Sequence, residues 1–385
     1  MLHLFFATTG IIVLIILAYL FFLAFVAILP EKKGRAASPS KRFLFLIPAH
    51  NEEKCIGKTL EHLKGLDYPE NLWDVVVVAD NCTDATNDIV RSHNVECIER
   101  RESGATGKGY VLAWAFERLV ARGHDAFVII DADTHVDKDF LLAMNRHLLQ
   151  GAQVVQAYSQ VRSPESSPLE GLAFLGFALN RNLRYKGRSR LGWQANLMGT
   201  GMCFARQVIE RYGWPALSKV EDLEMTMFLK LRNIRVVFAP DARVTVRLHS
   251  DISSSKGQRL RWDMGKFQVR DKYLPLLFKR FCQTRDISFL DSIMELLLPP
   301  FSIFFVGVWG LFLLYVILDF QGPDFVFWIW IGAVGGLVIY TLLGLISAKA
   351  DARIYRCLFY APFFMIWRLW IVIMEHIKKE RQGQW

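Results

Sequence analysis

The sequence lacks the cysteine patterns that bind a metal or cross-link a small secreted domain. Its six cysteines are scattered, and no two of them form a C-x-x-C pair. The pattern therefore indicates neither a zinc site nor a disulfide framework, and we expect free thiols in a reducing compartment. The cysteines are Cys55, Cys82, Cys97, Cys203, Cys282 and Cys357.

The sequence also lacks an arginine-rich tail and a zinc-finger pattern. No nucleic acid is therefore expected as a partner, in spite of a net charge of +9. Basic residues follow the apolar segments instead, which is typical of the cytoplasmic side of a membrane. The composition, 52% hydrophobic but 22% charged, indicates charged soluble parts joined to very apolar ones.

A first membrane helix is predicted over Leu4 to Leu29, a stretch that is nearly all apolar and uncharged. It exceeds the ~20 residues that a membrane helix needs. A signal peptide would have a basic residue before its apolar core, but no lysine or arginine precedes this stretch. The positive-inside rule places the N-terminus outside and the following chain in the cytoplasm, because basic residues come after the stretch: Lys32, Lys33, Arg35, Lys41 and Arg42.

Two more membrane helices are predicted near the other end of the chain. Ile293 to Leu318 is long enough to cross, and Pro299-Pro300 should kink or break it near its cytoplasmic end. The connector 319–324 has no basic residue, so we expect it outside. Phe325 to Ile346 then returns, and basic residues mark the inside again: Lys349, Arg353 and Arg356.

The last apolar stretch, Phe359 to Met374, is ambiguous. It contains Pro362 and Arg368, and an arginine at the centre of a span costs ~2.5–3.5 kcal/mol. A crossing would also leave the basic tail outside. We therefore favour a helix at the cytoplasmic interface over a fourth span, and we expect a multi-pass protein of the inner (cytoplasmic) membrane with its catalytic part in the cytoplasm.

Between Arg42 and roughly Arg285, strand and helix patterns alternate. Such alternation predicts an α/β domain with a mostly parallel sheet. No dinucleotide glycine fingerprint follows the first strand, which argues against NAD. The expected strands are Phe43 to Ile47, Val75 to Ala79, Phe127 to Ile130 and Val154 to Ala157. The expected helices are Ile56 to Leu66, a segment ending near Ser92, and Val111 to Arg122.

The stretch Phe127 to Ile130 runs directly into two acidic residues, Asp131 and Asp133. A short apolar run is typical of a strand buried on both faces, and open α/β sheets bind ligands at the carboxyl ends of their strands. Two close carboxylates repel each other unless a cation neutralises them. A divalent ion that carries substrate phosphates is one interpretation, and an ordinary Asp-rich turn is the other.

Two other strand ends carry acidic residues as well. Glu52 and Glu53 follow the first strand, and Asp80 and Asp84 follow the second. In a doubly wound sheet these ends and the Asp131 end converge on one crevice. A solvated loop explains any one of these acidic ends, but it explains three of them poorly.

Short motifs along the chain are Ile47-Pro48-Ala49-His50-Asn51-Glu52, Val78-Ala79-Asp80-Asn81-Cys82-Thr83-Asp84, Gly107-Lys108-Gly109, Asp131-Ala132-Asp133, Val220-Glu221-Asp222 and Gln258-Arg259-Leu260-Arg261-Trp262. In order and spacing they resemble the membrane-integral branch of glycosyltransferase family 2, which includes cellulose, hyaluronan and poly-N-acetylglucosamine synthases. The resemblance covers essentially the whole chain. It implies a GT-A-type (Rossmann-like) cytoplasmic domain flanked by transmembrane and interfacial helices.

The resemblance implies a nucleotide-sugar site. Pro48 and Glu52 would line the nucleotide pocket, and Asp80 would accept a hydrogen bond from the uracil imide, although it could also cap the next helix. Lys108 would pair with nucleotide phosphate or nearby carboxylates, or else be a solvated loop residue.

The resemblance also implies a divalent ion, Mg²⁺ or Mn²⁺. Asp133 would bind the ion directly, with Asp131 beside it or toward the ribose. The ion would hold the diphosphate and stabilise its charge as it leaves.

The resemblance implies that Asp222 is the catalytic base. Direct displacement at the anomeric carbon requires the acceptor hydroxyl to lose its proton, and it inverts an α-linked donor into a β-linkage. Val220 stands where the family pattern usually has threonine. A structural alternative is a capping box over Ser218 to Glu221 that opens a helix, with Asp222 and Glu224 favouring its N-terminus; both interpretations can hold.

The Gln258 motif follows a polar run, Ser253 to Gly257, that suits a gating loop over the site. Gln258, Arg261 and Trp262 share one face at helical spacing. Arg259 and Arg261 would clamp diphosphate, and Trp262 would stack on an acceptor sugar. An amphipathic helix at the membrane surface is the alternative.

Other residues are expected near the acceptor. Gly199, Thr200 and Gly201 would give it room or form a plain turn, and Glu221 would line the same side. The basic segment Asn180 to Lys186 would lie at lipid headgroups or near the donor phosphates.

The function expected is inverting, metal-dependent transfer from a UDP-sugar, most consistent with processive polysaccharide synthesis. Single-sugar transfer to a membrane lipid, as in ceramide glucosyltransferases, is the alternative. Three spans make a poor pore, so a processive enzyme would need a homo-oligomer or an accessory export partner. Asp133 and Asp222 together argue against a non-catalytic sensor. The expected parts are residues 1–30 (membrane helix), 31–250 (catalytic domain), 251–289 (gating loop and interfacial helix) and 290–385 (membrane hairpin, interfacial helix and tail).

Overall fold

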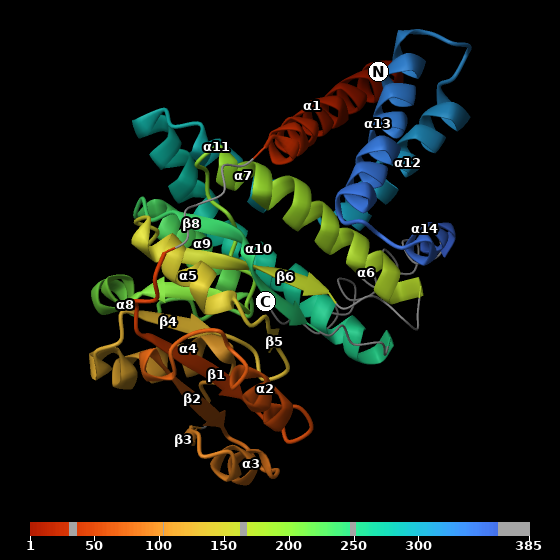
Figure 1. Ribbon diagram of the computed structural model, residues 1–385. Helices are drawn as coiled ribbons and strands as arrows, with labels where there is room; N and C mark the ends of the chain where they lie inside the picture. The colour runs from red at the N-terminus through yellow and green to blue at the C-terminus, as the bar shows by residue number, and fades with distance from the viewer. Residues whose placement is uncertain (31–36, 103, 162–167, 247–251, 361–385) are drawn as a thin grey trace.

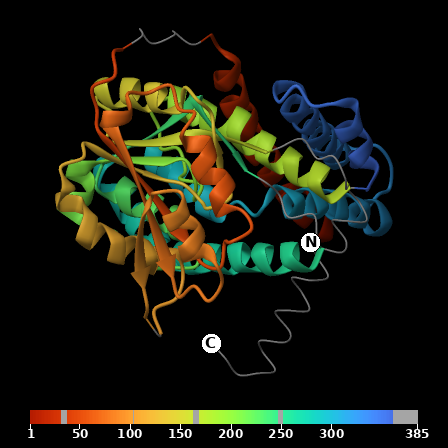
Figure 2. The same cartoon turned by 60° about the horizontal axis from the view of Figure 1, so that its bottom comes forward.

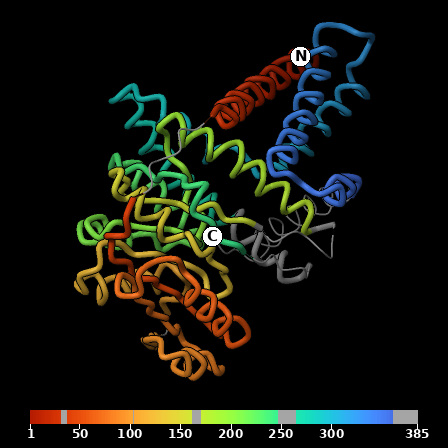
Figure 3. Tube along the Cα trace, viewed as in Figure 1, coloured from red at the N-terminus to blue at the C-terminus, as the bar shows by residue number. Residues whose placement is uncertain are grey.

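A computed structural model describes residues 1–30, 37–102, 104–161, 168–246 and 252–360 (Figure 1). Three long apolar helices, α1, α12 and α13, gather at one end, and a sheet with its covering helices forms the other. A run of helix from α6 to α7 lies between them, as the chain trace makes clear (Figure 3). Turning the molecule shows the three apolar helices on one side of the sheet (Figure 2).

The described residues form one eight-stranded sheet in the order β3-β2-β1-β4-β7-β6-β8-β5. The pairings β3–β2, β2–β1, β1–β4 and β6–β8 are parallel, and the other three are antiparallel. The strands are β1 (Phe43–Ala49), β2 (Trp73–Asp80), β3 (Glu96–Arg100), β4 (Ala126–Ile129), β5 (His135–Val136), β6 (Val154–Val161), β7 (Met202–Ala205) and β8 (Val236–Val246).

The apolar strands of the sheet are buried on both faces, as their sequence predicts. Successive side chains of a strand point to opposite faces, so Leu44 and Leu46 of β1 join one core while Phe43 and Phe45 join the other. The covering elements are α2 (Ile56–Leu63), α3 (Thr86–Ser92), α4 (Lys108–Leu119), α5 (Phe140–Leu149), α8 (Arg206–Tyr212) and α9 (Glu221–Leu231), with 3₁₀ turns η1 (Glu70–Leu72) and η2 (Val120–Arg122).

Five further helical elements complete the described chain as far as the second apolar helix. The π-helix η3 continues α6 directly and leads into α7 without a break. A break at Leu298, Pro299 and Pro300 separates α11 from α12, as the proline pair predicts. The elements are α6 (Pro168–Ala178), η3 (Leu179–Tyr185), α7 (Lys186–Arg190), α10 (Ile252–Thr284) and α11 (Ser288–Leu297).

Three helices in the described part of the chain are long and apolar enough to cross a membrane: α1 (Leu2–Ile28), α12 (Phe301–Leu318) and α13 (Phe325–Ser347). α1 and α13 match the predicted stretches within two residues, whereas α12 begins eight residues after the predicted start at Ile293, which belongs to α11. Large apolar side chains of α12 point away from the protein, with Ile317 75% and Leu313 54% exposed, which requires an apolar surrounding. Beyond α14 (Ala352–Cys357) and η4 (Leu358–Tyr360), most of the predicted interfacial stretch 359–374 lies outside the described residues.

A buried ion network fastens the apolar helix α1 to α7 and α11. The Arg188 guanidinium, fully buried, donates to Asp291 at 2.8 Å and pairs with Glu295 at 2.6 Å. The Tyr19 hydroxyl of α1 donates to the same Asp291 at 2.5 Å. Burial opposes a charge on Glu295, but Arg184 and Arg188 outweigh it and lower the pKa of Glu295 to about 2. The network therefore stays charged at neutral pH.

We expect Arg188→Leu to destabilise the protein strongly. Removal of Arg188 leaves the buried Asp291 carboxylate without its cation and leaves Glu295 with Arg184 alone, a loss that typically costs ~3–5 kcal/mol. The thermal unfolding midpoint of the detergent-solubilised protein should fall by ~5 °C or more. Arg206→Leu is the control, because Arg206 forms a half-exposed pair with Glu210 on one helix that is worth ~0.5 kcal/mol. Equal midpoints for the two variants would contradict the role of the network.

Candidate active site

Lys108 lies at the centre of a cluster of carboxylates. It is the first residue of α4, and the preceding Gly107 adopts φ 117°, a conformation that favours glycine. The ammonium donates to the Asp131 carboxylate and to the Gly199 carbonyl, the latter at 2.6 Å, and Glu221 lies 4.0 Å away. Burial opposes the charge on Lys108, yet Asp131 and Glu221 raise its pKa above the usual value.

The turn Gly199-Thr200-Gly201 brings β7 against the end of β4. The Thr200 hydroxyl accepts from the Asp131 N–H at 3.1 Å. Gly199 and Gly201 adopt φ 79° and 67°. A Cβ on Gly201 would lie 2.9 Å from the Cβ of Ala157, and one on Gly199 would lie 3.7 Å from Asp222 Oδ2. The turn thus needs glycine and lies directly beside the Asp222 carboxylate.

Asp222 and Glu221 open helix α9 next to this turn. The Leu223 N–H donates to Asp222 Oδ1 at 2.8 Å. Burial raises the pKa of Asp222, and this effect outweighs Lys108 and the Leu223 N–H. Burial and the neighbouring Asp222 also raise the pKa of Glu221, to about 7. A carboxylate that binds its proton near neutral pH is suited to proton transfer.

The capping-box interpretation of Ser218 to Glu221 is wrong. The residue that precedes α9 is Val220, and its side chain makes no capping hydrogen bond. The Ser218 N–H donates instead to Glu224 at 2.8 Å, and Lys272 of α10 donates to the same carboxylate at 2.6 Å. Glu224 of α9 thus binds both the segment before the helix and α10. Glu221 lies 4.0 Å from Lys108 instead.

Asp80 at the end of β2 is held by an arginine that the sequence analysis missed. Arg100 pairs with Asp80 at 2.6 Å from the neighbouring strand β3, and the Asn81 amide donates to the same oxygen at 3.1 Å. Within the described residues no hydrogen bond reaches Asp80 Oδ2. Asp80 does not cap α3, because Asp84 accepts from the Thr86 N–H at 3.0 Å.

The end of β1 is tied to the end of β2. Pro48 is half-buried beside Val78 of β2. The Glu52 N–H donates to the Thr86 hydroxyl at 2.8 Å, and the Glu52 carboxylate accepts from the Cys55 thiol at 3.0 Å. The strands β2, β1 and β4 are parallel neighbours in the sheet. Glu52, Asp80 and Asp131 therefore all follow the carboxyl ends of adjacent strands, as the sequence predicts.

A divalent ion would find few protein ligands here. Among the described residues, no three His, Cys, Asp or Glu side chains are grouped to hold a metal, and Asp131 is engaged by Lys108. Mg²⁺ commonly uses only one or two carboxylates when substrate phosphates complete its shell. Asp133, half-buried in the turn after β4, could serve as such a single carboxylate ligand beside substrate phosphates.

The predicted gating loop is helical. Ser253 to Gly257 belong to α10, which begins at Ile252, so the expectation of a loop is wrong. Further along α10, a Cβ on Gly265 would lie 2.8 Å from Val220, which places this helix against the start of α9. The side chains of Gln258, Arg259, Arg261 and Trp262 lie outside the described part of the structure, and their roles stay predictions.

A family model described as "Glycosyltransferase like family 2" matches residues 39–265. The beta-monoglucosyldiacylglycerol synthase of Synechocystis sp. is 28% identical over 249 residues, which is 62% of this chain and 51% of that protein. The poly-beta-1,6-N-acetyl-D-glucosamine synthase of Staphylococcus aureus is 22% identical over 246 residues, 62% of this chain and 58% of that protein. The chain thus spans only about half to three fifths of the length of these relatives.

Among solved structures, the mannosyltransferase PcManGT from Pyrobaculum calidifontis, in complex with GDP-Man and Mn²⁺, superposes with a TM-score of 0.54 at 16% identity. The match covers 91% of this chain and 99% of that one. This likeness confirms the predicted GT-A-type fold. Because the matched residues include all eight strands of the described sheet and α9, the chain belongs to glycosyltransferase family 2.

Proposed function

We propose that this chain transfers a sugar from a UDP-sugar to an acceptor hydroxyl with inversion, forming a β-glycosidic linkage at the membrane. The observation that carries the proposal is the Asp222 carboxylate. Burial raises the pKa of this carboxylate. It lies beside Gly199 and Lys108, close to the carboxyl ends of β1, β2 and β4, which are followed by polar residues.

Asp222 acts as the general base. The acceptor hydroxyl must lose its proton as it attacks the anomeric carbon, and a base is most effective when its pKa lies near the working pH. The raised pKa of Asp222 moves it in that direction. Glu221, half-buried one residue earlier, lines the acceptor side.

The donor binds at the ends of β1 and β2. Asp80 Oδ2 accepts from the imide N–H of uracil, while Arg100 holds Oδ1 in place. Pro48 and Glu52 line the nucleotide pocket. Asp133 would hold a Mg²⁺ or Mn²⁺ ion, which would offset the charge that develops on the leaving diphosphate. Arg259 and Arg261 add donors to the diphosphate, with Gln258 on the same helix, and Trp262 stacks on the acceptor.

The acceptor is a membrane lipid. Three helices able to span a membrane make a poor path for a growing polymer, whereas a lipid reaches the site from the bilayer. Processive polysaccharide synthesis is the second candidate and would require a homo-oligomer or an export partner. The relatives include a glycolipid synthase and a polysaccharide synthase. In this proposal residues 31–250 form the catalytic part on the cytoplasmic side of the inner membrane.

We expect Asp222→Asn to abolish transfer while UDP binding persists. The amide keeps the shape of the carboxylate but cannot take the proton, so UDP release in the presence of donor and acceptor should fall ~10²–10⁴-fold. Calorimetric titration of UDP should give an unchanged affinity. Asp88→Asn, at a side chain that is 86% exposed, is the matched control and should keep full turnover. Retained turnover in Asp222→Asn would refute the assignment.

We expect Lys108→Met to move the acid limb of kcat/KM to higher pH. The base must be deprotonated, so activity falls as pH drops through its pKa. Lys108 lowers the pKa of Asp222, and its loss should raise that pKa. The pH profile of the residual activity measures the shift. Lys138→Met, at a 75% exposed side chain, should leave the profile unmoved; an unmoved limb in Lys108→Met would exclude this coupling.

A UDP-release screen tests donor and metal together. UDP-glucose, UDP-N-acetylglucosamine, UDP-galactose and UDP-glucuronate are each assayed with the full-length protein in vesicles. Chelation should lower turnover ~100-fold or more, and Mn²⁺ or Mg²⁺ should restore it. Radiolabel from the best donor should enter a lipid-soluble product that carries one sugar. A high-mass polymer would favour the second candidate instead, and unchanged turnover after chelation would rule out the metal.

A further inference from the structure

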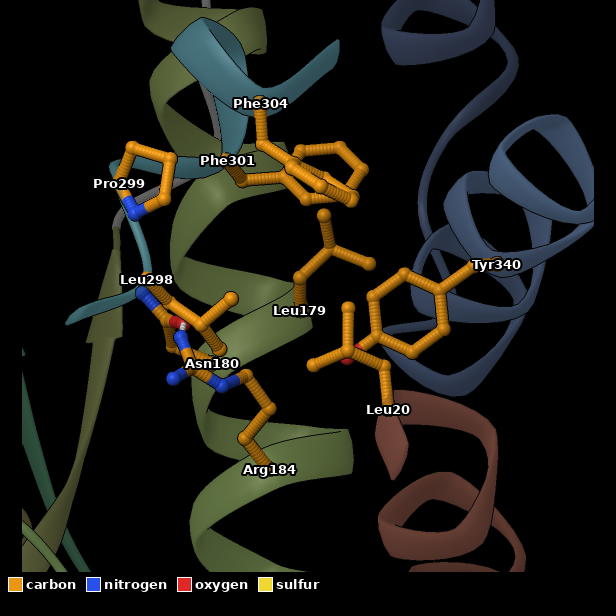
Figure 4. A pocket seen from close by; sticks show the side chains of 9 residues that line it. All are labelled: Leu20, Leu179, Asn180, Arg184, Leu298, Pro299, Phe301, Phe304 and Tyr340. Carbon is orange, nitrogen blue, oxygen red and sulfur yellow. Dashed lines mark hydrogen bonds between the residues drawn. The ribbon is translucent and has the colours of Figure 1, made fainter. Parts of the chain in front are cut away.

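A small pocket opens where the apolar helices meet the π-helix η3 (Figure 4). Its apolar wall includes Leu20 of α1, Leu179 of η3 and Phe301 of α12. Its polar lining comes from Asn180 and Arg184 of η3 and from Tyr340 of α13. Four elements that are distant in sequence therefore build one site with an apolar and a polar side.

The pocket lies near the membrane boundary on the side of the sheet. Leu20 stands eight residues before the end of α1 at Ile28, a rise of roughly 12 Å. Tyr340 stands seven residues before the end of α13 at Ser347, roughly 10 Å, and Phe301 is the first residue of α12. This depth corresponds to the region where the polar end of a lipid passes into its chains.

Two polar groups of the pocket have no partner in the described structure. The Tyr340 hydroxyl is fully buried, reaches into the pocket and makes no hydrogen bond to a described residue. The Arg184 Nε–H is likewise buried without a partner among these residues. A buried polar group left unpaired costs ~1–3 kcal/mol. A ligand with an oxygen at this position would satisfy them.

The one charged side chain among the lining residues, Arg184, is already paired. Its other nitrogens donate to Asn180 at 2.8 Å and to Glu295 at 2.5 Å. The other cations near Glu295 are bound as well, Arg188 to Asp291 and Lys266 to the Leu298 carbonyl at 2.6 Å. Because the cation of the lining already has its carboxylate, the lining favours an uncharged oxygen, such as an ester carbonyl, over a phosphate.

The π-helix η3 connects the pocket with the proposed base. Leu179 and Arg184 line the pocket, and Tyr185, the last residue of η3, faces the catalytic side. Burial, followed by the charges of Glu295 and Asp222, raises the pKa of Tyr185 to about 12. The Tyr185 hydroxyl thus lies within electrostatic range of both Glu295, beside the pocket, and Asp222, the proposed base. Short π-helical segments frequently occur at functional sites.

We propose that this pocket binds a neutral membrane lipid, with an ester carbonyl oxygen at Tyr340 and Arg184 and its chain along Leu20 and Phe301, so that its hydroxyl stays free. The pocket is then the place from which the acceptor hydroxyl reaches Asp222. This second step rests on the proposed transfer to a lipid, whereas lipid binding does not.

The test is photo-crosslinking of the full-length protein in phosphatidylcholine nanodiscs. A diazirine-bearing dioleoylglycerol is the probe, and peptides from α1, η3 and α13 are analysed by mass spectrometry. We expect labelling of these peptides that unlabelled dioleoylglycerol competes away and that dioleoyl phosphatidate does not. Equal or better competition by the phosphatidate would overturn the preference for a neutral lipid.

Two variants test the pocket itself. Leu20→Trp fills it and should reduce labelling about tenfold, whereas Ile15→Trp, on the 63% exposed face of the same helix, should leave labelling unchanged. Tyr340→Phe removes only one hydroxyl and should reduce labelling about three- to tenfold. Labelling that survives both Leu20→Trp and Tyr340→Phe would overturn the proposed site.

Turnover separates this inference from the proposed function. Labelling needs no UDP-sugar, so its absence with transfer to lipid intact would overturn the pocket and leave the function standing. Labelling of the wild-type pocket without transfer to any neutral lipid would overturn its role as the acceptor site. If the pocket binds the lipid and the enzyme transfers sugar to it, Leu20→Trp should raise KM for dioleoylglycerol while UDP affinity stays within about twofold of the wild type.

Discussion

The half-buried ammonium of Lys108 makes the acidic centre of this protein possible. Asp131, Glu221 and Asp222 come from the end of β4 and the start of α9, and three carboxylates so close would repel one another strongly without a cation. Lys108 offsets part of that repulsion and also binds the Gly199 carbonyl. It thereby fixes the turn before β7 beside Asp222 and keeps the pKa of that carboxyl from rising further.

A second set of charges fixes the catalytic part relative to the membrane helices. Arg188 of α7 binds Asp291 of α11, which also accepts from Tyr19 of α1. A side chain at Gly187 would collide with the Leu23 carbonyl, so α7 lies directly on α1. Because η3 runs from this junction to the region of Asp222, the proposed base has a defined position beneath the bilayer.

The sequence predicted those features that depend on local patterns. Strands β1, β2 and β4 are continuous apolar runs, and the three membrane-length helices are long apolar stretches. The pairing of Asp80 with Arg100 was missed because β3 is short and only partly buried. The network of Arg184 and Glu295 joins residues 111 positions apart, which no local pattern reveals. The capping box failed because α9 begins at Glu221, so that Val220 and not Ser218 is the residue that precedes the helix.

The arrangement around Lys108 also explains how one site can separate donor from acceptor. Direct displacement requires the attacking hydroxyl and the leaving diphosphate on opposite sides of the anomeric carbon. Asp131 lies on the side of the strand ends, next to Asp133 and the proposed diphosphate, whereas Asp222 lies on the side of α9 and η3. Lys108 stands between them and contacts both sides. In the proposed transfer to a lipid, a hydroxyl that comes from the side of the apolar helices therefore meets Asp222 before it meets the sugar.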